Sequence, residues 1–190
     1  MPGIKISGIT NEEDARWAAI LGVEFVSVSL MEGDHRKTSD EMASRITGML
    51  PSYTEVILEA DSPDSVSERR IGKISPAYIS TPLEPEDGSA DTIPGILSLR
   101  KLERIEDSPE VKLIEVKIEK DLSGEDIAGI ALKFPDTPLI IEGDFELPVI
   151  KNICAGYQPR AWSVRDIISR SPRRIDYPLM KEYIREISLW

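Results

Sequence analysis

The amino-acid sequence predicts an α/β domain in which strands and helices alternate along the chain and the strands pair in parallel. Two observations support this class. Short segments of alternating or continuous hydrophobicity recur throughout the chain, and segments with helical spacing of apolar residues separate most of them. With 190 residues, of which 41% are hydrophobic, the chain can bury a sizeable core within one domain that covers residues 1–190.

The first strand and the turn after it organise the chain. Residues 4–7 alternate isoleucine with a polar side chain, which is the period of two expected of a strand. Gly8 allows the backbone to turn sharply, and Thr10 or Asn11 can cap a helix whose first turn is acidic. Ser7 is the last side chain of the strand, so we expect it at the sheet edge where α/β proteins bind ligands.

The remaining elements follow the same alternation. The predicted helices cover residues 12–22, 39–50, 63–74, 124–134, 147–155 and 177–187. The predicted strands cover residues 23–30, 54–60, 77–81, 95–102, 111–118, 138–143 and 160–167. Gly22 is a C-cap signal, and the continuous apolar run 138–143 is typical of a strand that is covered on both faces. Residues 82–94 have the composition of a loop, and we expect only a shortened helix after 95–102.

Composition and charge argue against several classes of partner and site. The net charge of −11 argues against nucleic acid and anionic membrane surfaces, because both repel an acidic protein. The single cysteine, Cys154, excludes an internal disulfide, and together with the single histidine, His35, it does not suit a zinc cluster. No apolar run approaches the length of a membrane span, and the N-terminus lacks a signal-peptide core. We therefore expect a cytoplasmic protein without a cofactor.

The segment 5–15 carries a specific resemblance to a known family. Residues 5–11 read Lys-Ile-Ser-Gly-Ile-Thr-Asn, and an acidic helix with an early alanine follows. This segment resembles the opening of the phosphoribosylanthranilate isomerases, which reads Lys-Ile-Cys-Gly-Ile-Thr-Asn before a similar helix. The resemblance implies a compact (β/α)8 TIM barrel. Because 190 residues is near the lower limit for this fold, we expect the helices after the fourth and fifth strands to be shortened or irregular. The resemblance also implies a ligand site at the C-terminal ends of the strands.

The resemblance further implies a reaction, the Amadori rearrangement of phosphoribosylanthranilate in tryptophan biosynthesis, which needs a base and an acid. The base position is Ser7, where the family has a cysteine. A serine hydroxyl must be activated by a neighbouring base, so we expect a structural hydroxyl here. The acid position is Glu115, where the family has an aspartate. The alternative is that Glu115 pairs inside the barrel with Lys117, which lies two residues on and points the same way.

The same resemblance implies a carboxylate-binding arginine. Arg36 matches the family's arginine in the loop after the second strand. A guanidinium group can pair with a carboxylate through two parallel hydrogen bonds. The alternative is that Arg36 pairs with Asp34 or Asp40, which are close in sequence.

The phosphate site of the family is the part that the sequence preserves least. Gly143 remains after the seventh strand, but Asp144 stands in place of a second glycine. Arg165 and Asp166 follow the eighth strand, where the family has small residues. Two carboxylates beside a phosphate dianion are unfavourable by Coulomb repulsion, and Arg165 offsets only one of them.

These positions leave three hypotheses for function. The first is a divergent family member that has lost or greatly weakened the isomerase step and binds a small anionic ligand through Arg36 and Arg165. The second is an active isomerase that uses Glu115 as its acid. The third is a different isomerase or lyase with a divalent metal bound by carboxylates, the candidates being Glu115, Glu142, Asp144 and Asp166. We expect no nucleic-acid or membrane partner, and either a monomer or a homodimer.

Overall fold

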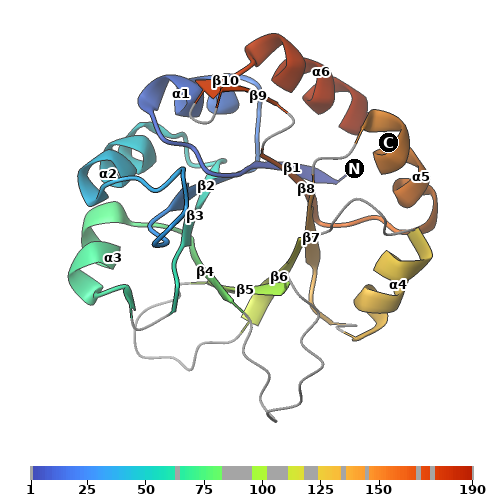
Figure 1. The fold of residues 1–190 in the computed structure, drawn as a ribbon, viewed down its shortest axis with the longest axis horizontal. Coiled ribbons are helices and arrows are strands. Elements are labelled where there is room, and N and C mark those ends of the chain that lie inside the picture. Colours follow the sequence, from blue (N-terminus) through green and yellow to red (C-terminus); the bar gives the residue numbers. More distant parts are fainter. Residues whose placement is uncertain are drawn as a thin grey trace.

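Eight strands pair in chain order and close into a barrel, and helices surround it (Figure 1). The computed structural model describes residues 2–62, 65–82, 96–101, 111–117, 124–133, 136–143, 146–165, 168–171 and 174–189. The barrel strands are β1 (Gly3–Ile6), β2 (Phe25–Ser29), β3 (Glu55–Glu59), β4 (Tyr78–Pro82), β5 (Ile96–Lys101), β6 (Val111–Lys117), β7 (Leu139–Glu142) and β8 (Ala161–Val164). The helices are α1 (Glu12–Ile20), α2 (Asp40–Met49), α3 (Glu68–Ile74), α4 (Gly124–Lys133), α5 (Leu147–Gly156) and α6 (Tyr177–Ile187). The predicted α/β class is confirmed.

One strand runs against the others. β5 pairs antiparallel with both β4 and β6, whereas the other neighbouring barrel strands pair in parallel. The all-parallel arrangement that the resemblance implied is therefore wrong at β5. A parallel neighbour needs a crossover that returns the chain to the starting end, whereas an antiparallel neighbour is joined at the end already reached. Reversal of β5 thus removes the need for a crossover helix on either side. The expected shortened helices fall on 83–95 and 102–110, outside the described residues.

Local sequence signals set the ends of the helices. α1 begins after Asn11, whose Oδ1 accepts a hydrogen bond from the backbone N–H of Asp14 at 2.8 Å, so Asn11 is the capping residue rather than Thr10. α2 begins after Ser39, as expected, and the Ser39 side chain accepts from the N–H of Met42. The chain leaves α1 through Gly22 at a φ of +76°, a conformation that glycine adopts without strain.

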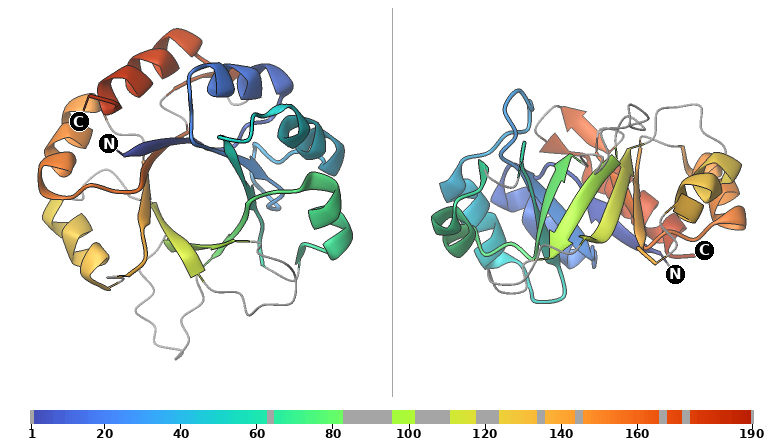
Figure 2. Two further views of the ribbon diagram at one scale, coloured as in Figure 1. Left: turned by 180° about the vertical axis from the view of Figure 1, so that it is seen from behind. Right: turned by 90° about the horizontal axis from the view of Figure 1, so that it is seen from below.

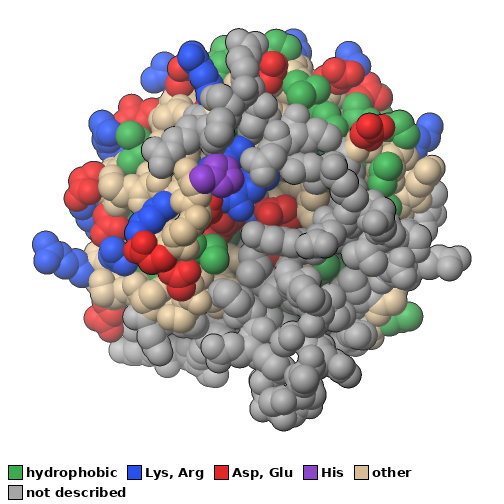
Figure 3. Space-filling view, in the orientation of Figure 1, with side chains coloured by type: hydrophobic (Ala, Val, Ile, Leu, Met, Phe, Trp, Pro, Cys, Tyr) green, Lys and Arg blue, Asp and Glu red, His purple; other side chains and the backbone are tan. Residues whose placement is uncertain are grey.

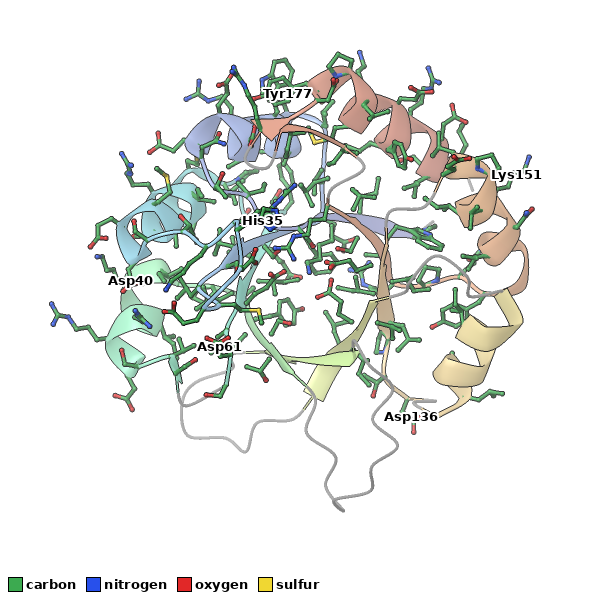
Figure 4. All side chains as sticks on the ribbon, in the orientation of Figure 1. His35, Asp40, Asp61, Asp136, Lys151 and Tyr177 are labelled. Carbon is green, nitrogen blue, oxygen red and sulfur yellow. The ribbon has the colours of Figure 1, made fainter. Side chains whose placement is uncertain are left out.

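Two apolar layers hold the barrel together. The outer layer lies between the strands and the helices, and it includes residues of the fully buried strand β7. The inner layer fills the lower part of the barrel and consists of Phe25, Ile57, Tyr78, Leu113, Ile140 and Ala161. Side chains fill the centre of the ring of strands, so the barrel is a packed core rather than a pore (Figure 4).

A short antiparallel hairpin, β9 (Ser169–Ser171) with β10 (Arg174–Ile175), lies between β8 and α6, and the sequence did not predict it. Both chain ends lie at the same end of the barrel (Figure 2), which is the end where β1 begins. Among the described helices, none combines the length and the apolar character needed to cross a bilayer. The opposite end, where the parallel strands finish, is therefore the mouth to search for a site.

Truncation of the outer layer should destabilise the fold strongly. Ile141 on β7 is fully buried in the outer layer, so we expect Ile141→Ala to lower the free energy of unfolding by about 2–5 kcal/mol. Leu132 on α4 is 80% exposed, and Leu132→Ala should change it by less than about 0.5 kcal/mol. Urea unfolding of both variants measures the difference, and equal effects of the two substitutions would contradict this packing.

Candidate functional site

Charged side chains meet inside the upper half of the barrel, toward the C-terminal ends of the parallel strands. They come from four strands, Lys5 from β1, Glu59 from β3, Glu115 from β6 and Glu142 from β7. All four side chains are buried. Residues that are far apart in sequence converge here because the parallel strands of a barrel end at the same edge.

The ammonium group of Lys5 lies among the three carboxylates. Its Nζ is 2.5 Å from Oε1 of Glu115, 3.3 Å from Oε1 of Glu59 and 3.8 Å from Oε2 of Glu142. One oxygen from each carboxylate lies within 4.8 Å of the other two, and Lys5 supplies the cation between them. Glu115 pairs with Lys5. The side chain of Lys117, the partner that the sequence offered as an alternative, lies outside the described residues, so that pairing stays a prediction.

Burial and charge act against each other in this cluster. Burial raises the pKa of Glu115 from 4.5 to about 7, the Lys5 ammonium opposes this rise, and the charges of Glu142 and Glu59 add to it. Burial lowers the pKa of Lys5, but the three carboxylates outweigh it and hold that pKa above its usual value. At neutral pH the amine of Lys5 is therefore charged, and Glu115 lies near the midpoint of its titration.

The hydroxyl of Ser7 is held between two side chains. Its Oγ donates to Oε2 of Glu142 at 2.7 Å and lies 2.7 Å from Oγ of Ser163. Ser163 also donates to the same carboxylate oxygen, at 3.1 Å. The hydroxyl of Ser7 is therefore a hydrogen-bond donor, and its acceptor is the carboxylate of Glu142.

Two arginines lie over Ser7 at the mouth. Arg36 donates from Nη1 to the backbone oxygen of Ser7 at 3.3 Å and from Nη2 to that of Arg165 at 3.4 Å. Arg165 forms an ion pair with Asp34, with 2.5 Å between Nη2 and Oδ2. A Cβ at Gly8, which has a φ of +69°, would lie 2.6 Å from Cδ of Arg36 and 3.3 Å from Nε of Arg165. Because glycine has no Cβ, the side chains of Arg36 and Arg165 can both pack against the backbone at this position.

The view into the mouth shows how these groups are arranged (Figure 3). His35 lies at the surface next to basic side chains, and acidic side chains are recessed beside them. Nε of Arg36 donates to Nε2 of His35 at 3.4 Å, which fixes the arginine beneath this loop. Arg160 lies before β8 and Arg165 after it, so these two belong to opposite ends of the barrel; Arg160 pairs with Glu24.

The phosphate-site positions are described only in part. Gly143 follows β7, and its N–H donates to the backbone oxygen of Ser163 at 3.3 Å. Gly143 and Arg165 thus follow neighbouring strands at the same mouth. Asp144 and Asp166 lie outside the described residues.

The sequence reasoning missed Glu59, Ser163 and the role of Lys5. Three buried side-chain oxygens in this region, Oε2 of Glu59, Oε2 of Glu115 and Oγ of Ser80, have no hydrogen-bond partner within the described part of the chain. Ser80 pairs in register with Glu59, so the two side chains share a face. Buried polar atoms without a partner are rare, and they indicate that water or a ligand completes the site. One sequence signal could have indicated these residues: Glu59 and Ser163 are polar residues near the ends of otherwise apolar strands.

A closed α/β barrel with charged groups converging at the C-terminal mouth is the architecture of a small-molecule site. Comparison of sequences finds N-(5′-phosphoribosyl)anthranilate isomerases. The protein from Neisseria meningitidis serogroup B is 28% identical over 137 residues, covering 72% of this chain and 58% of that protein. The protein from Chlamydia felis is 46% identical over 44 residues, covering 23% of this chain and 21% of that protein. No family model matches the chain.

Solved structures agree on the fold. The phosphoribosylanthranilate isomerase of Thermus thermophilus has a TM-score of 0.72 at 16% identity, with 98% of each chain covered. A phosphoribosylanthranilate isomerase solved with reduced 1-(o-carboxyphenylamino)-1-deoxyribulose 5-phosphate has a TM-score of 0.68 at 16% identity, with 100% of each chain covered. In sequence over part of their length, and in fold over the whole chain, the protein is thus similar to phosphoribosylanthranilate isomerases.

The protonation of Glu115 should appear in the pH dependence of stability. The folded protein holds this proton up to about pH 7, whereas the unfolded chain releases it near 4.5, so the folded state binds more protons between these values. The contribution of Glu115 to stability is thus full below about pH 4.5 and is lost as pH rises through 7. We expect the free energy of unfolding of the wild type, relative to Glu115→Gln, to fall across this window.

Urea unfolding between pH 4 and 8 gives this difference, and Glu182→Gln on the exposed surface of α6 is the control. A difference between the wild type and Glu115→Gln that stays flat over the window would show that Glu115 titrates at its ordinary value.

Proposed function

We propose that the chain binds a small anionic molecule at the mouth of its barrel and that the Amadori isomerase activity of its family is lost or greatly weakened in it. The observation that carries the proposal is the convergence of Arg36 and Arg165 over Gly8, next to a serine at the position of the family's base. The fold supports a site at this mouth, and the residues there determine what it does.

The charges of the site favour a carboxylate over a phosphate. Guanidinium groups pair well with either anion. However, Glu142 lies directly beneath Ser7, and the pKa of Arg165, which burial alone would lower, is held above its usual value by Glu59, Glu142 and Asp34. This much negative charge repels a dianion more strongly than a singly charged carboxylate. The ligand class is therefore a small molecule that bears a carboxylate.

The contacts of Ser7 support the loss of the isomerase step. A cysteine thiolate is reachable near neutral pH, and it accepts a proton directly. The Ser7 hydroxyl instead donates to Glu142, and it has no histidine among the partners given above. General-base catalysis typically contributes a factor of about 10²–10⁴, so replacing the thiol in the family's mechanism weakens turnover by roughly that factor.

An active isomerase is the second candidate, and one observation favours it. Glu115 is at the position of the family's acid, and burial raises its pKa to about 7, which suits proton donation at neutral pH. The metal-dependent alternative has less support. The Lys5 ammonium lies between the three described carboxylates and supplies the positive charge that a divalent ion would bring.

Binding and turnover test the proposal together. Titration calorimetry with reduced 1-(o-carboxyphenylamino)-1-deoxyribulose 5-phosphate and with its dephosphorylated form should give similar affinities, because the carboxylate is the recognised group. Arg36→Gln and Arg165→Gln should each weaken binding at least tenfold, or about 1.4 kcal/mol. Arg185→Gln on α6, where Arg185 pairs with its neighbour Glu186, is the matched control. Turnover of phosphoribosylanthranilate should lie roughly 10²–10⁴-fold below that of a cysteine-bearing relative.

Two results would overturn this proposal. If Arg36→Gln and Arg165→Gln both bind the compound as tightly as the wild type, the two arginines do not bind the ligand. Full rescue of a tryptophan auxotroph that lacks the isomerase would favour the second candidate instead. The expected cytoplasmic location and the choice between monomer and homodimer stay predictions.

A further inference from the structure

We propose that a polar cavity beside the barrel, between the loops that follow β2 and β3, binds a small zwitterion of the α-amino acid class. The cavity is separate from the mouth, and the inference does not rest on the proposed function. Its volume is about 390 Å³, which lies within the range of small-molecule pockets. Residues of the two loops and of the first turns of α2 and α3 line it.

The cavity lies on the outer side of the strands. Asp40 and Asp61, which both line it, lie toward α2 and α3 rather than at the centre of the ring of strands (Figure 4). None of its described lining residues belongs to the four charged side chains inside the barrel or to the two arginines of the mouth. The loop after β2 separates the two places, because Arg36 contacts the mouth whereas Lys37 and Thr38 line the cavity. A molecule bound here is therefore a second ligand.

A buried hydroxyl without a partner is the first argument. Thr38 lines the cavity and is only 9% exposed. Its backbone N–H donates to the backbone oxygen of Ser29 at 2.8 Å, but no hydrogen bond joins its hydroxyl to a described residue. Buried polar groups are rarely left in this state unless water or a ligand completes them. The wall of the cavity thus offers a hydroxyl that the described residues leave unused.

The charged groups of the lining are the second argument. Lys37 forms an ion pair with Glu32, and Nε of Arg70 lies 2.9 Å from Oδ2 of Asp40. Asp61 differs from the other two carboxylates of the described lining, because no described cation pairs with it. Its Oδ2 accepts a hydrogen bond from the backbone N–H of Glu32 at 3.1 Å. The carboxylate of Asp61 is therefore the place for the ammonium group of a ligand.

The remaining donors define the other end of the ligand. Arg70 donates from Nε to Asp40 and from Nη1 to a backbone oxygen at 3.2 Å, whereas Nη2 has no described partner. A ligand carboxylate can accept from this Nη2, from the ammonium of Lys37 and from the Thr38 hydroxyl. A ligand with only a positive charge would be repelled by the two cations, and one with only a negative charge would be repelled by Asp61. A small molecule that bears both charges satisfies both sides of the cavity.

The test is an NMR titration of isotope-labelled protein with L-valine, read at the backbone amides of Thr38 and Asp61. L-Valine is the probe because Leu30 and Val66, the apolar part of the lining, can contact a short branched side chain. These amide shifts should change until the site is saturated. Isobutylamine lacks the carboxylate of valine and 3-methylbutanoate lacks its ammonium group, and each should bind at least about tenfold more weakly here. The amide of Ser7 reports the mouth separately.

Substitutions at the two ends of the ligand locate the site. Asp61→Asn keeps an oxygen that can accept from the backbone N–H of Glu32 but removes the charge, so it should weaken valine binding at least about tenfold. Thr38→Val removes only the hydroxyl and should weaken binding about fivefold, whereas Thr38→Ser keeps the hydroxyl and should bind like the wild type. Asp136→Asn, at an exposed aspartate before β7, is the matched control and should also bind like the wild type.

Four results would overturn the inference. The first is that L-valine leaves the amides of Thr38 and Asp61 unchanged, and the second is that it shifts only the amide of Ser7, which would place it at the mouth. The third is that isobutylamine or 3-methylbutanoate binds at the cavity as tightly as valine. The fourth is unchanged valine binding by Asp61→Asn. Because Asp61 is exposed, this variant decides the matter if Thr38→Val does not fold.

Discussion

The ammonium group of Lys5, surrounded by three carboxylates inside the barrel, is the interaction on which the upper half of the structure depends. The side chains of Lys5 and Glu115 are completely buried, and Glu59 is nearly so. Charges in such a place are tolerated only when they are paired, because each ion loses its hydration on burial. Lys5 therefore determines where the ends of β3, β6 and β7 place their carboxylates. The hydroxyls and arginines of the mouth lie on top of this arrangement.

The charged site is separate from the apolar layer that closes the barrel. The apolar inner layer, which includes Phe25, Ile57 and Tyr78, lies below the charged groups and packs independently of them. Substitutions at Ser7 or Glu142 would thus alter the chemistry at the mouth without touching the layer that closes the barrel. Glu59, Glu115 and Glu142 bring negative charge to the strand ends, and Arg165 and Lys5 balance part of it.

Much of the fold could be predicted from the sequence because its signals are local. The alternation of residues 4–7 predicted β1, and the continuous apolar run 138–143 predicted β7. The capping residues Asn11 and Ser39 indicated where α1 and α2 begin. The direction of β5 could not be predicted in this way. A strand has the same hydrophobic pattern in either direction, and its partners on β4 and β6 are chosen by tertiary pairing.

The site was predicted less completely for the same reason. Ser7, Glu115 and Arg36 were found because they match a linear motif, and the structure places them within one mouth. The link between them was missed because it is non-local. Lys5 and Glu115 are separated by 110 positions, and neither the alternation of the first strand nor the motif that begins at Lys5 indicates this partner. Asp144 and Asp166, which the sequence also nominated, lie outside the described residues.

Replacement of the central cation is the most direct test of this account. Lys5→Met keeps most of the side-chain volume but leaves the three carboxylates without their ammonium group. Removing one partner of a buried ion pair typically costs about 3–5 kcal/mol, so equilibrium unfolding in urea at pH 7 should show a loss of that size. Lys151→Met on the exposed face of α5 should show a change below about 0.5 kcal/mol. A Lys5→Met protein as stable as the wild type at pH 7 would contradict the central role of Lys5.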